Sequence, residues 1–528
     1  MESDRTRVLR IARNAELVHP DLPLVEAFLN DAVDGERAAK YLLQTYADCS
    51  DVNFTRFVKD WRDLVNLFYV ETPYSRYLSW AQKKQVARRD DYRCCLTGEQ
   101  CRFWNLWDVF PIIPPTALCI REHRLYEMLG AFTSSFHRDL LEDQTLENQS
   151  RNRWTLSKGA AMFFSSGAIR LENLEGTKYE VLDNHIGGEA PAFYTFRRLC
   201  DWKCDLADYS NSGIESPDQE LLDIRSRFSR SLMWTDIATK INCRPCLRRS
   251  QNTGGSPLKR TIISTLLAIW SKFPSFIRFQ TYRLLKTAGS YLYGSHNMGI
   301  QRLPFEMYLK YGPQSEAERH AGEFNSLKIV QSQTSIPVPH PIDHLLSRTE
   351  SFLVTSRIEG GPAGLAVDEC SDEEMHRMAE DLRSWIAELR LIKGNKDSKY
   401  AITNATRGSC LDYRISGNRV GPFPSEKEFS ESLCLGALPG LMHRTDHKIV
   451  FTHADLNMRN IIVEDGRITG IVDWENAGFF PEYWEYTKCH FGVRISKRWP
   501  KMIDAAFGNK YEAELGIERQ YWEYHSGW

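Results

Sequence analysis

The sequence predicts an α+β protein of several domains, because helical and strand patterns occupy different stretches of a chain of 528 residues. A chain of this length exceeds what one hydrophobic core usually serves. Residues 1–88 carry apolar side chains at helical spacing, for example around Trp61 and Phe68. Near the other end, residues 461–463 and 468–472 are two β-branched runs around an Asp-Gly turn, which predicts a β-hairpin.

The overall composition is that of an ordinary globular protein, with 42% hydrophobic and 26% charged residues. A formal net charge of −2 gives no electrostatic reason to expect nucleic acid or a membrane as a partner. The start of the sequence has no apolar run typical of a secretory signal, and the longest apolar stretch, 262–270, is far below the ~20 residues that span a bilayer. Thirteen cysteines in this context favour reduced thiols. We therefore expect an intracellular, cytoplasmic protein.

Residues 89–94 read Arg-Asp-Asp-Tyr-Arg-Cys, and the pair Thr97-Gly98 follows them. This opening resembles that of fungal HNH-nuclease-like domains, and we assign residues 89–246 to such a domain. The resemblance implies a strand that carries a His, then an Asn, and then a second His on a helix. In that family these groups activate water and hold one metal ion at a phosphodiester.

The catalytic positions of the HNH-like pattern are not filled in this sequence. Phe110 or Pro111 stands where the first His is expected, and the helix expected at 158–163 carries no His. Asn152 matches the expected Asn. Because Phe neither ligates a metal nor accepts a proton, we predict a degenerate scaffold used for packing or protein contacts and not a working nuclease.

Four cysteines allow two interpretations. Cys200 and Cys204 lie four residues apart, while Cys243 and Cys246 form a C-x-x-C. Two such pairs can build a four-thiolate zinc site. The wide first pair and the long separation between the pairs favour the other hypothesis, in which reduced thiols are buried as small apolar side chains.

Residues 247–260 form the clearest predicted boundary, because Gly254-Gly255-Ser256-Pro257 and the flanking polar residues show no burial pattern. The segment is also basic. We interpret it as a solvated linker, in preference to a nucleic-acid-binding or nuclear-import segment.

After the linker, residues 261–528 alternate between helical and strand patterns. Residues 274–293 have the spacing of an amphipathic helix, 300–311 and 352–355 read as strand segments, and 373–392 return to helical spacing. The apolar positions of this last helix are predicted to belong to the core and not to a binding stripe.

The stretch from Phe451 to Trp474 carries the chemistry. Asp455 lies five residues before Asn460, and Asp473 follows Asn460 by thirteen. Because the predicted hairpin lies between them, it folds Asp473 back toward the other two side chains. Mg²⁺ prefers oxygen ligands from one or two side chains together with substrate phosphates. Asn460 and Asp473 can supply such ligands, which leaves Asp455 to accept a proton from a substrate hydroxyl.

These residues stand in the order His453-Ala454-Asp455, Asn460 and, at 471–475, Ile-Val-Asp-Trp-Glu. The pattern resembles the catalytic core of the aminoglycoside phosphotransferase family, small-molecule relatives of protein kinases, and in its wider features the fungal branch. The resemblance implies a two-lobed, protein-kinase-like fold for the C-terminal half, with ATP and Mg²⁺ as cofactors. Ala454 departs from the family, which usually has Gly there, and the departure could strain a backbone turn.

The resemblance also implies a lysine that pairs with the α- and β-phosphates, and Lys310 takes that role on its strand. We predict that Glu323 positions Lys310, with Glu316 and Glu318 as rival candidates. Isolated glycines at 294 and 299 do not make a Gly-rich phosphate loop, so a plain hairpin is expected over the nucleotide.

Two further roles follow from the same resemblance. The segment after 352–355 would be the hinge between the lobes, where backbone groups of Ser356 and Ile358 would receive the adenine edge. His453 would brace the catalytic loop by hydrogen bonding.

The acids and aromatic residues in 474–485 leave two interpretations open. They would suit a cleft for a cationic or polyhydroxy compound, or Trp484 would belong to the core and Glu485 to a helix surface.

We therefore predict an ATP-dependent phosphotransferase that acts on the hydroxyl of a small molecule. The alternative is a non-catalytic, nucleotide-binding regulatory or scaffold protein joined to an inactive HNH-like module.

Overall fold

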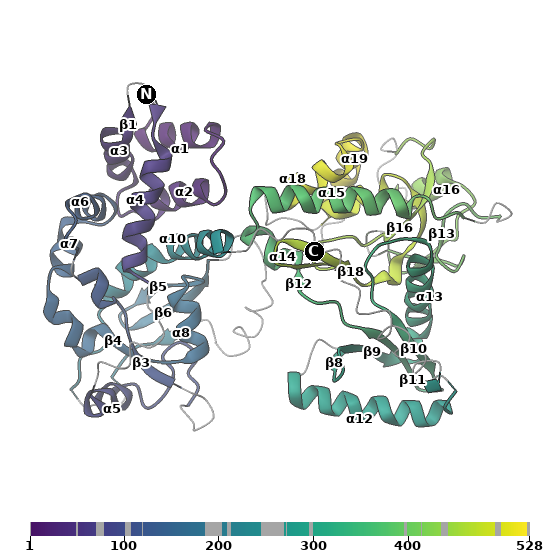
Figure 1. Cartoon of the computed structure of the whole chain (residues 1–528), viewed down its shortest axis with the longest axis horizontal. Helices are drawn as coiled ribbons and strands as arrows, with labels where there is room; N and C mark the ends of the chain where they lie inside the picture. The colour runs from purple at the N-terminus through teal and green to yellow at the C-terminus, as the bar shows by residue number, and fades with distance from the viewer. Residues whose placement is uncertain are drawn as a thin grey trace. The chain divides into compact units, whose positions relative to one another are not determined.

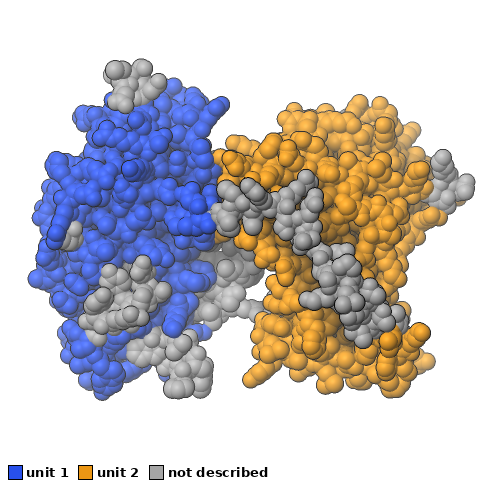
Figure 2. Space-filling model, viewed as in Figure 1, with its two compact units in different colours: residues 1–243 blue, residues 244–528 orange. Residues whose placement is uncertain are grey.

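The computed structural model divides the chain into two compact units, Met1–Cys243 and Arg244–Trp528 (Figures 1 and 2). No helix in its described part is long and apolar enough to cross a membrane. The structure describes residues 2–48, 51–69, 79–100, 107–118, 120–184, 203–208, 213–243, 269–270, 272–294, 299–394, 399–412, 414, 416–434, 442–491 and 498–524.

The first unit begins with a layer of helices packed on one long helix, α10 (Gln219–Cys243). Aromatic rings hold this layer together: the Trp61 ring lies 4.8 Å from that of Phe28 and 4.7 Å from that of Phe132, measured between centroids. The helices that contribute are α1 (Asp4–Asn14), α2 (Asp21–Asp31), α3 (Gly35–Tyr46), α4 (Phe54–Leu67) and α6 (His123–Phe132).

A second part of this unit contains two small sheets. Strand β3 (Trp107–Pro111) pairs antiparallel with β4 (Arg153–Ser157), and helix α8 (Lys158–Ser165) follows β4 directly. Helix α5 (Trp80–Arg89) packs against both strands. The other sheet has the order β5-β6-β7, formed by Ile169–Glu175, Lys178–Asp183 and Lys203–Asp205.

The residues of the HNH-like pattern have structural contacts here. Phe110 is buried in β3. The Asn152 side chain accepts a hydrogen bond from the Ile113 N–H at 2.8 Å and donates to the Ile113 and Leu146 carbonyls at 3.0 and 3.3 Å. Asn152 therefore ties the start of β4 to the segment after β3. The HNH-like assignment itself stays a prediction.

The cysteine hypotheses fall partly outside the described residues, because Cys200 and Cys246 lie there. Of the other two, Cys204 is buried in β7 and Cys243 is exposed at the end of α10. The predicted linker, 247–260, also lies outside the described residues.

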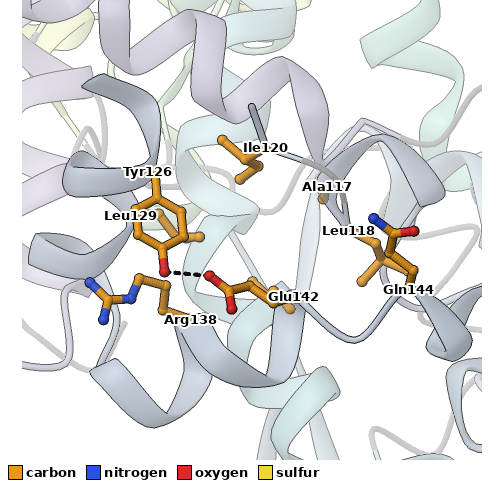
Figure 3. Close-up of a pocket in the computed structure, with 9 residues that line it drawn as sticks. Ala117, Leu118, Ile120, Tyr126, Leu129, Arg138, Glu142 and Gln144 are labelled. Carbon is orange, nitrogen blue, oxygen red and sulfur yellow. Dashed lines mark hydrogen bonds between the residues drawn. The ribbon is translucent and has the colours of Figure 1, made fainter. Parts of the chain in front are cut away.

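A cavity of about 250 Å³ lies beside α6 and α7 (Ser135–Leu141) in the first unit (Figure 3). Tyr126 donates a hydrogen bond to the Glu142 carboxylate at its rim, and the Arg138 guanidinium lies 4.8 Å from the centre of the Tyr126 ring. Tyr126 thus contacts both Glu142 and Arg138, and the lining also includes the apolar side chains of Leu118 and Leu129.

In the described part of the second unit, helix α12 (Ser275–Tyr293) packs against a four-stranded antiparallel sheet of order β10-β11-β9-β8. Gly289 permits this packing, because a Cβ atom there would lie 2.1 Å from the Arg302 carbonyl oxygen. Helix α13 (Ala317–Gln333) packs against β10 and β11. The strands are β8 (Ile300–Leu303), β9 (Met307–Pro313), β10 (Pro341–Leu346) and β11 (Glu350–Ser356).

The rest of this unit is a larger lobe around a continuous core. The predicted hairpin is confirmed as β17 (Ile461–Glu464) and β18 (Arg467–Ile471), which pair antiparallel and place Ile461 opposite Ile471. Helix α15 (Asp372–Leu389) packs on β18 and on α18 (Arg498–Phe507), and its inner side chains are buried, as predicted.

Shorter elements complete this lobe. They are β12 (Gly361–Pro362), α14 (Ala363–Ala366), β13 (Thr403–Asn404), β14 (Cys410–Asp412), β15 (Ser416–Val420), α16 (Glu426–Cys434), β16 (Ile449–Thr452), β19 (Gly478–Pro481), α17 (Trp484–His490) and α19 (Glu512–Tyr524).

We expect Asn152→Ala to lower the free energy of unfolding by about 2–4 kcal/mol, because it leaves buried backbone groups of residues 113 and 146 without partners. Urea unfolding followed by far-UV circular dichroism measures the change. The control is Asn148→Ala, which removes an exposed side chain four residues earlier. Equal stability of the two variants would contradict the structural role of Asn152.

Candidate active site

Lys310 contacts two acidic side chains, and the three residues come from separate elements. The Lys310 Nζ atom lies 2.6 Å from a carboxylate oxygen of Glu323 and 2.5 Å from one of Asp473. Lys310 comes from β9, Glu323 from α13, and Asp473 from the end of β18. The strand places Lys310 here because its neighbour Leu309 points into the core of the small lobe and the side chains of a strand alternate.

The rivals of Glu323 have other contacts. Glu316 pairs with Arg319 at 2.8 Å, and Glu318 pairs with Arg419 at 3.3 Å. Glu323 is the buried member of the three acids. The structure thus brings together Lys310 and the glutamate that we predicted from the sequence.

Burial and neighbouring charges have opposite effects on the pKa values of Lys310 and Asp473. Burial alone would lower the pKa of Lys310, but the carboxylates of Asp473, Glu323 and Glu475 outweigh it and raise that pKa. Burial would raise the pKa of Asp473, yet the Lys310 ammonium holds it below its usual value. Burial dominates for Glu323 and raises its pKa. We therefore describe Lys310 and Asp473 as a charged pair.

Glu475 belongs to the same group, and the sequence reasoning missed it as a site residue. Its carboxylate lies 3.9 Å from Lys310 Nζ and 3.5 Å from Arg319. Burial, together with the Asp473 charge, raises the pKa of Glu475 to about 8. Oxygen atoms of Glu323, Asp473 and Glu475 lie within 4.8 Å of one another. The spacing Asp-Trp-Glu was the available signal, since a short 3₁₀ turn (Trp474–Asn476) brings the two acids to one side.

Three side chains hold Asp455, two from its own loop and one from helix α17. The Asn460 amide donates to Oδ2 at 2.9 Å, and the Asn457 amide donates to Oδ1 at 3.2 Å. The Lys488 Nζ atom lies 3.1 Å from Oδ1. Asn460 also donates to the Asp455 backbone carbonyl at 2.8 Å. Of these partners, the sequence analysis identified Asn460, while Asn457 and Lys488 were not found.

His453 connects this loop to the residue before Asp473. Its Nε2 donates to the Val472 carbonyl at 2.9 Å, while its Nδ1 accepts from the Asp455 backbone N–H at 3.2 Å. The two contacts select one ring tautomer, with the proton on Nε2. The position agrees with the bracing role predicted for His453.

Two residues of the site adopt left-handed backbone conformations. Ala454 has φ = +62° and Asp473 has φ = +67°. For a residue with a side chain this conformation costs about 1–2 kcal/mol. The strain expected at Ala454 is therefore present, and it falls on a fully buried residue beside the proposed base.

The two predicted hinge residues differ in their contacts. The Ser356 backbone N–H already donates to the His340 carbonyl at 3.0 Å, and the Ser356 hydroxyl accepts from the His340 N–H at 2.8 Å. The Ile358 side chain lies close to Gly470 of β18, where a Cβ atom would be 3.0 Å from Ile358 Cγ2. Their contacts to adenine stay a prediction.

The aromatic segment 474–485 belongs to the core of the large lobe. Trp474, Tyr483 and Trp484 are fully buried, and Glu485 is 2% exposed. The structure therefore favours the core interpretation of this segment over the open cleft. The Glu485 carboxylate is buried and accepts the His453 backbone N–H at 2.5 Å, so it does not lie on a helix surface.

Comparison with known proteins finds a family match in the C-terminal region. Residues 271–528 match the family described as "Phosphotransferase enzyme family" (APH). The match confirms the predicted α+β architecture with a kinase-like C-terminal fold. The fungal branch stays a prediction. The search of curated proteins found no match.

Several solved structures are similar over the same region. A thermostable mutant of aminoglycoside phosphotransferase APH(4)-Ia, in a ternary complex with ADP and hygromycin B, has 14% identity over 43% of this chain and 79% of that chain, with a TM-score of 0.30. The gentamicin–APH(2")-IIa complex has 13% identity over 42% and 76%, with a TM-score of 0.30. APH(3'')-Id from Streptomyces rimosus, in complex with ADP and streptomycin, has 16% identity over 48% and 92%, with a TM-score of 0.28.

We expect His320→Gln to reduce the loss in free energy of unfolding that occurs when the pH is lowered. Burial and the nearby Lys310 lower the pKa of His320 from 6.5 to about 4. Between those values the unfolded chain binds a proton that the folded chain does not, so the free energy of unfolding falls as the pH drops through this window. Each pKa unit corresponds to about 1.4 kcal/mol.

Urea unfolding at several pH values between 4 and 7 gives the free energy of unfolding as a function of pH. The slope of this dependence should be smaller in the variant than in the wild type. His376→Gln is the control, because His376 is 70% exposed on α15. A slope in His320→Gln identical to that of the wild type would contradict the prediction.

Proposed function

We propose that the C-terminal unit, whose residues 271–528 match the phosphotransferase family, transfers the γ-phosphate of ATP to the hydroxyl of a small molecule. The observation that supports this proposal best is the meeting of Lys310, Glu323 and Asp473 at one point. His453 links that point to Asp455 through residue 472. In this proposal the phosphate-binding lysine contacts the metal-binding acid directly, and His453 connects the residue before that acid to the backbone of the base.

In this proposal Lys310 contacts the α- and β-phosphates, and Glu323 holds Lys310 in place. Lys310 is neutralised by Asp473 in this structure. A phosphate oxygen can replace that carboxylate as the partner of Lys310, which releases Asp473 to bind a cation. Binding of the nucleotide would then occur by exchange between two ion pairs, so that Lys310 never lacks a negative partner.

The residues fit a magnesium ion by their donor chemistry. Asp473 offers a carboxylate, and Asn460 uses its amide nitrogen on Asp455, so its side-chain oxygen remains as an acceptor. Hard oxygen ligands of this kind are those that Mg²⁺ takes beside substrate phosphates. A bound Mg²⁺ would neutralise phosphate charge. Asn460 would then serve both the metal and the orientation of Asp455.

Asp455 is the proposed base. It would accept the proton of the substrate hydroxyl while the hydroxyl oxygen bonds to the γ-phosphorus and the bond from that phosphorus to ADP breaks. Asn460, Asn457 and Lys488 fix its carboxylate, so the base is oriented before the substrate arrives.

We expect Asp455→Ala to lower kcat by about 10²–10⁴-fold, because the acceptor loses its general base. The loss corresponds to about 3–5 kcal/mol of transition-state stabilisation. ADP formation from Mg-ATP, measured across a panel of hydroxyl compounds, provides the test. Asp446→Asn is the control, since Asp446 is 75% exposed. If Asp455→Asn turned over substrate as fast as the wild type, the assignment of the base would be wrong.

We expect Asp473→Asn to make ADP binding independent of magnesium. In the wild type, chelation of Mg²⁺ with EDTA should weaken ADP binding at least tenfold, which is about 1.4 kcal/mol. Isothermal titration calorimetry with and without EDTA measures both proteins. Asp465→Asn, at the exposed turn between β17 and β18 where Asn tolerates the left-handed backbone, is the matched control. A magnesium effect that persists in Asp473→Asn would contradict the proposed ligand.

A further inference from the structure

Helix α17 supplies two charges to the catalytic loop. Glu485 and Lys488 lie three residues apart, so both project from one side of the helix. Glu485 accepts the backbone N–H groups of His453 and Ala454 at 2.5 and 3.4 Å. Lys488 contacts the side chain of the next residue, Asp455. The helix therefore contacts both the backbone of the loop and its proposed base.

The main counter-ion of Lys488 is Asp455. The other nearby acid, Asp412, lies 3.8 Å from Lys488 but already has a two-point contact with Arg414, at 3.0 and 3.2 Å. Trp484 also donates to Asp412, at 3.0 Å. The negative charge of Asp412 is thus balanced by another cation.

The burial of Lys488 shows that its charge is not a surface feature. Its side chain is 5% exposed, and that of Asp455 is 17% exposed. Removing an ammonium group from water is expensive, and an apolar side chain of the same length would fill this space at lower cost. Glu485 already fastens α17 to the loop. Packing alone therefore does not require an ammonium group beside Asp455.

The contacts of Asp455 also distinguish its two oxygen atoms. Among the residues that the structure describes, Oδ1 has two partners, Lys488 and Asn457, whereas Oδ2 has one, Asn460. Because a carboxylate oxygen has two acceptor positions, these residues occupy both positions of Oδ1 and one of Oδ2. Other charged or titratable groups on the elements around Asp455 are Glu485 and Cys489 of α17, Asp412 and Arg414 beside β14, and His453 of the same loop.

We propose that Lys488 is a positioning residue for phosphoryl transfer, which occupies Oδ1 of Asp455 so that Oδ2 receives the proton of the acceptor hydroxyl. This inference rests on the proposed function of the unit. In the transfer step the hydroxyl proton moves to Oδ2, the hydroxyl oxygen bonds to the γ-phosphorus, and ADP leaves with the electron pair of the broken bond.

The test compares Lys488→Met, Lys488→Arg and the exposed control Lys501→Met. We expect Lys488→Met to lower kcat about 10–100-fold with little change in the KM for ATP, since Lys488 acts on the base and not on the nucleotide. Lys488→Arg keeps a cation at Oδ1 and should restore the wild-type kcat.

A double-mutant cycle separates this role from a structural one. If Lys488 acts through Asp455, Lys488→Met has no further effect on kcat when Asp455 is already Asn. Additive losses in the double variant, or a kcat in Lys488→Met equal to that of the wild type, would overturn the inference. Should Lys488→Met fail to fold, as judged by its thermal unfolding and by titration with ADP and Mg²⁺, a wild-type kcat in Lys488→Arg supports it and a kcat lowered at least tenfold overturns it.

The two proposals can fail separately. Turnover by the wild type that depends on Asp455 but not on Lys488 would remove only this inference. Absence of turnover with Mg-ATP across the panel of hydroxyl compounds would remove the proposed function and, with it, the role of Lys488.

Discussion

A buried ammonium group at Lys310 is the constraint on which the C-terminal unit depends. Its side chain is 19% exposed, so it requires negative partners, and these come from α13 and from the end of β18. The sheet of the small lobe, its helix and the hairpin of the large lobe therefore each bring a charged side chain to one point. Removing Lys310 would leave the buried Glu323 carboxylate and Asp473 without their shared cation, which is far costlier than losing a surface ion pair.

The same region concentrates backbone strain. Ala454 and Asp473 both have positive φ, and His453 bridges the segments in which they lie. Glu485 accepts the N–H groups of residues 453 and 454, which holds the strained loop in place. Burial raises the pKa of Glu485. The contact between Glu485 and the loop therefore joins a desolvated carboxyl group to a strained turn. Such features persist only where the surrounding structure over-determines them.

The parts of the site that could be predicted from the sequence are those set by local spacing. The hairpin followed from β-branched runs and an Asp-Gly turn, and it brings Asp473 back toward the loop of Asp455. The contacts that were missed come from tertiary packing: Lys488 lies 33 residues after Asp455 in the chain, on a helix whose seven residues are all buried. Trp484 and Glu485, at the start of this helix, were left open between a cleft lining and a core or helix-surface position, because no periodicity distinguishes a short helix that is buried on every side.

The proposed base and the proposed metal ligand are each paired with one lysine, and the two pairs differ in exposure. Lys310 and Asp473 are 19% and 34% exposed, whereas Lys488 and Asp455 are 5% and 17% exposed. A nucleotide brings phosphate and a cation, which can exchange with a lysine–carboxylate pair only where solvent and ligand reach it. In the proposed function, the more exposed pair is therefore the one that would open for the nucleotide. The deeper pair would stay intact, so that the orientation of the base would not change while the nucleotide binds.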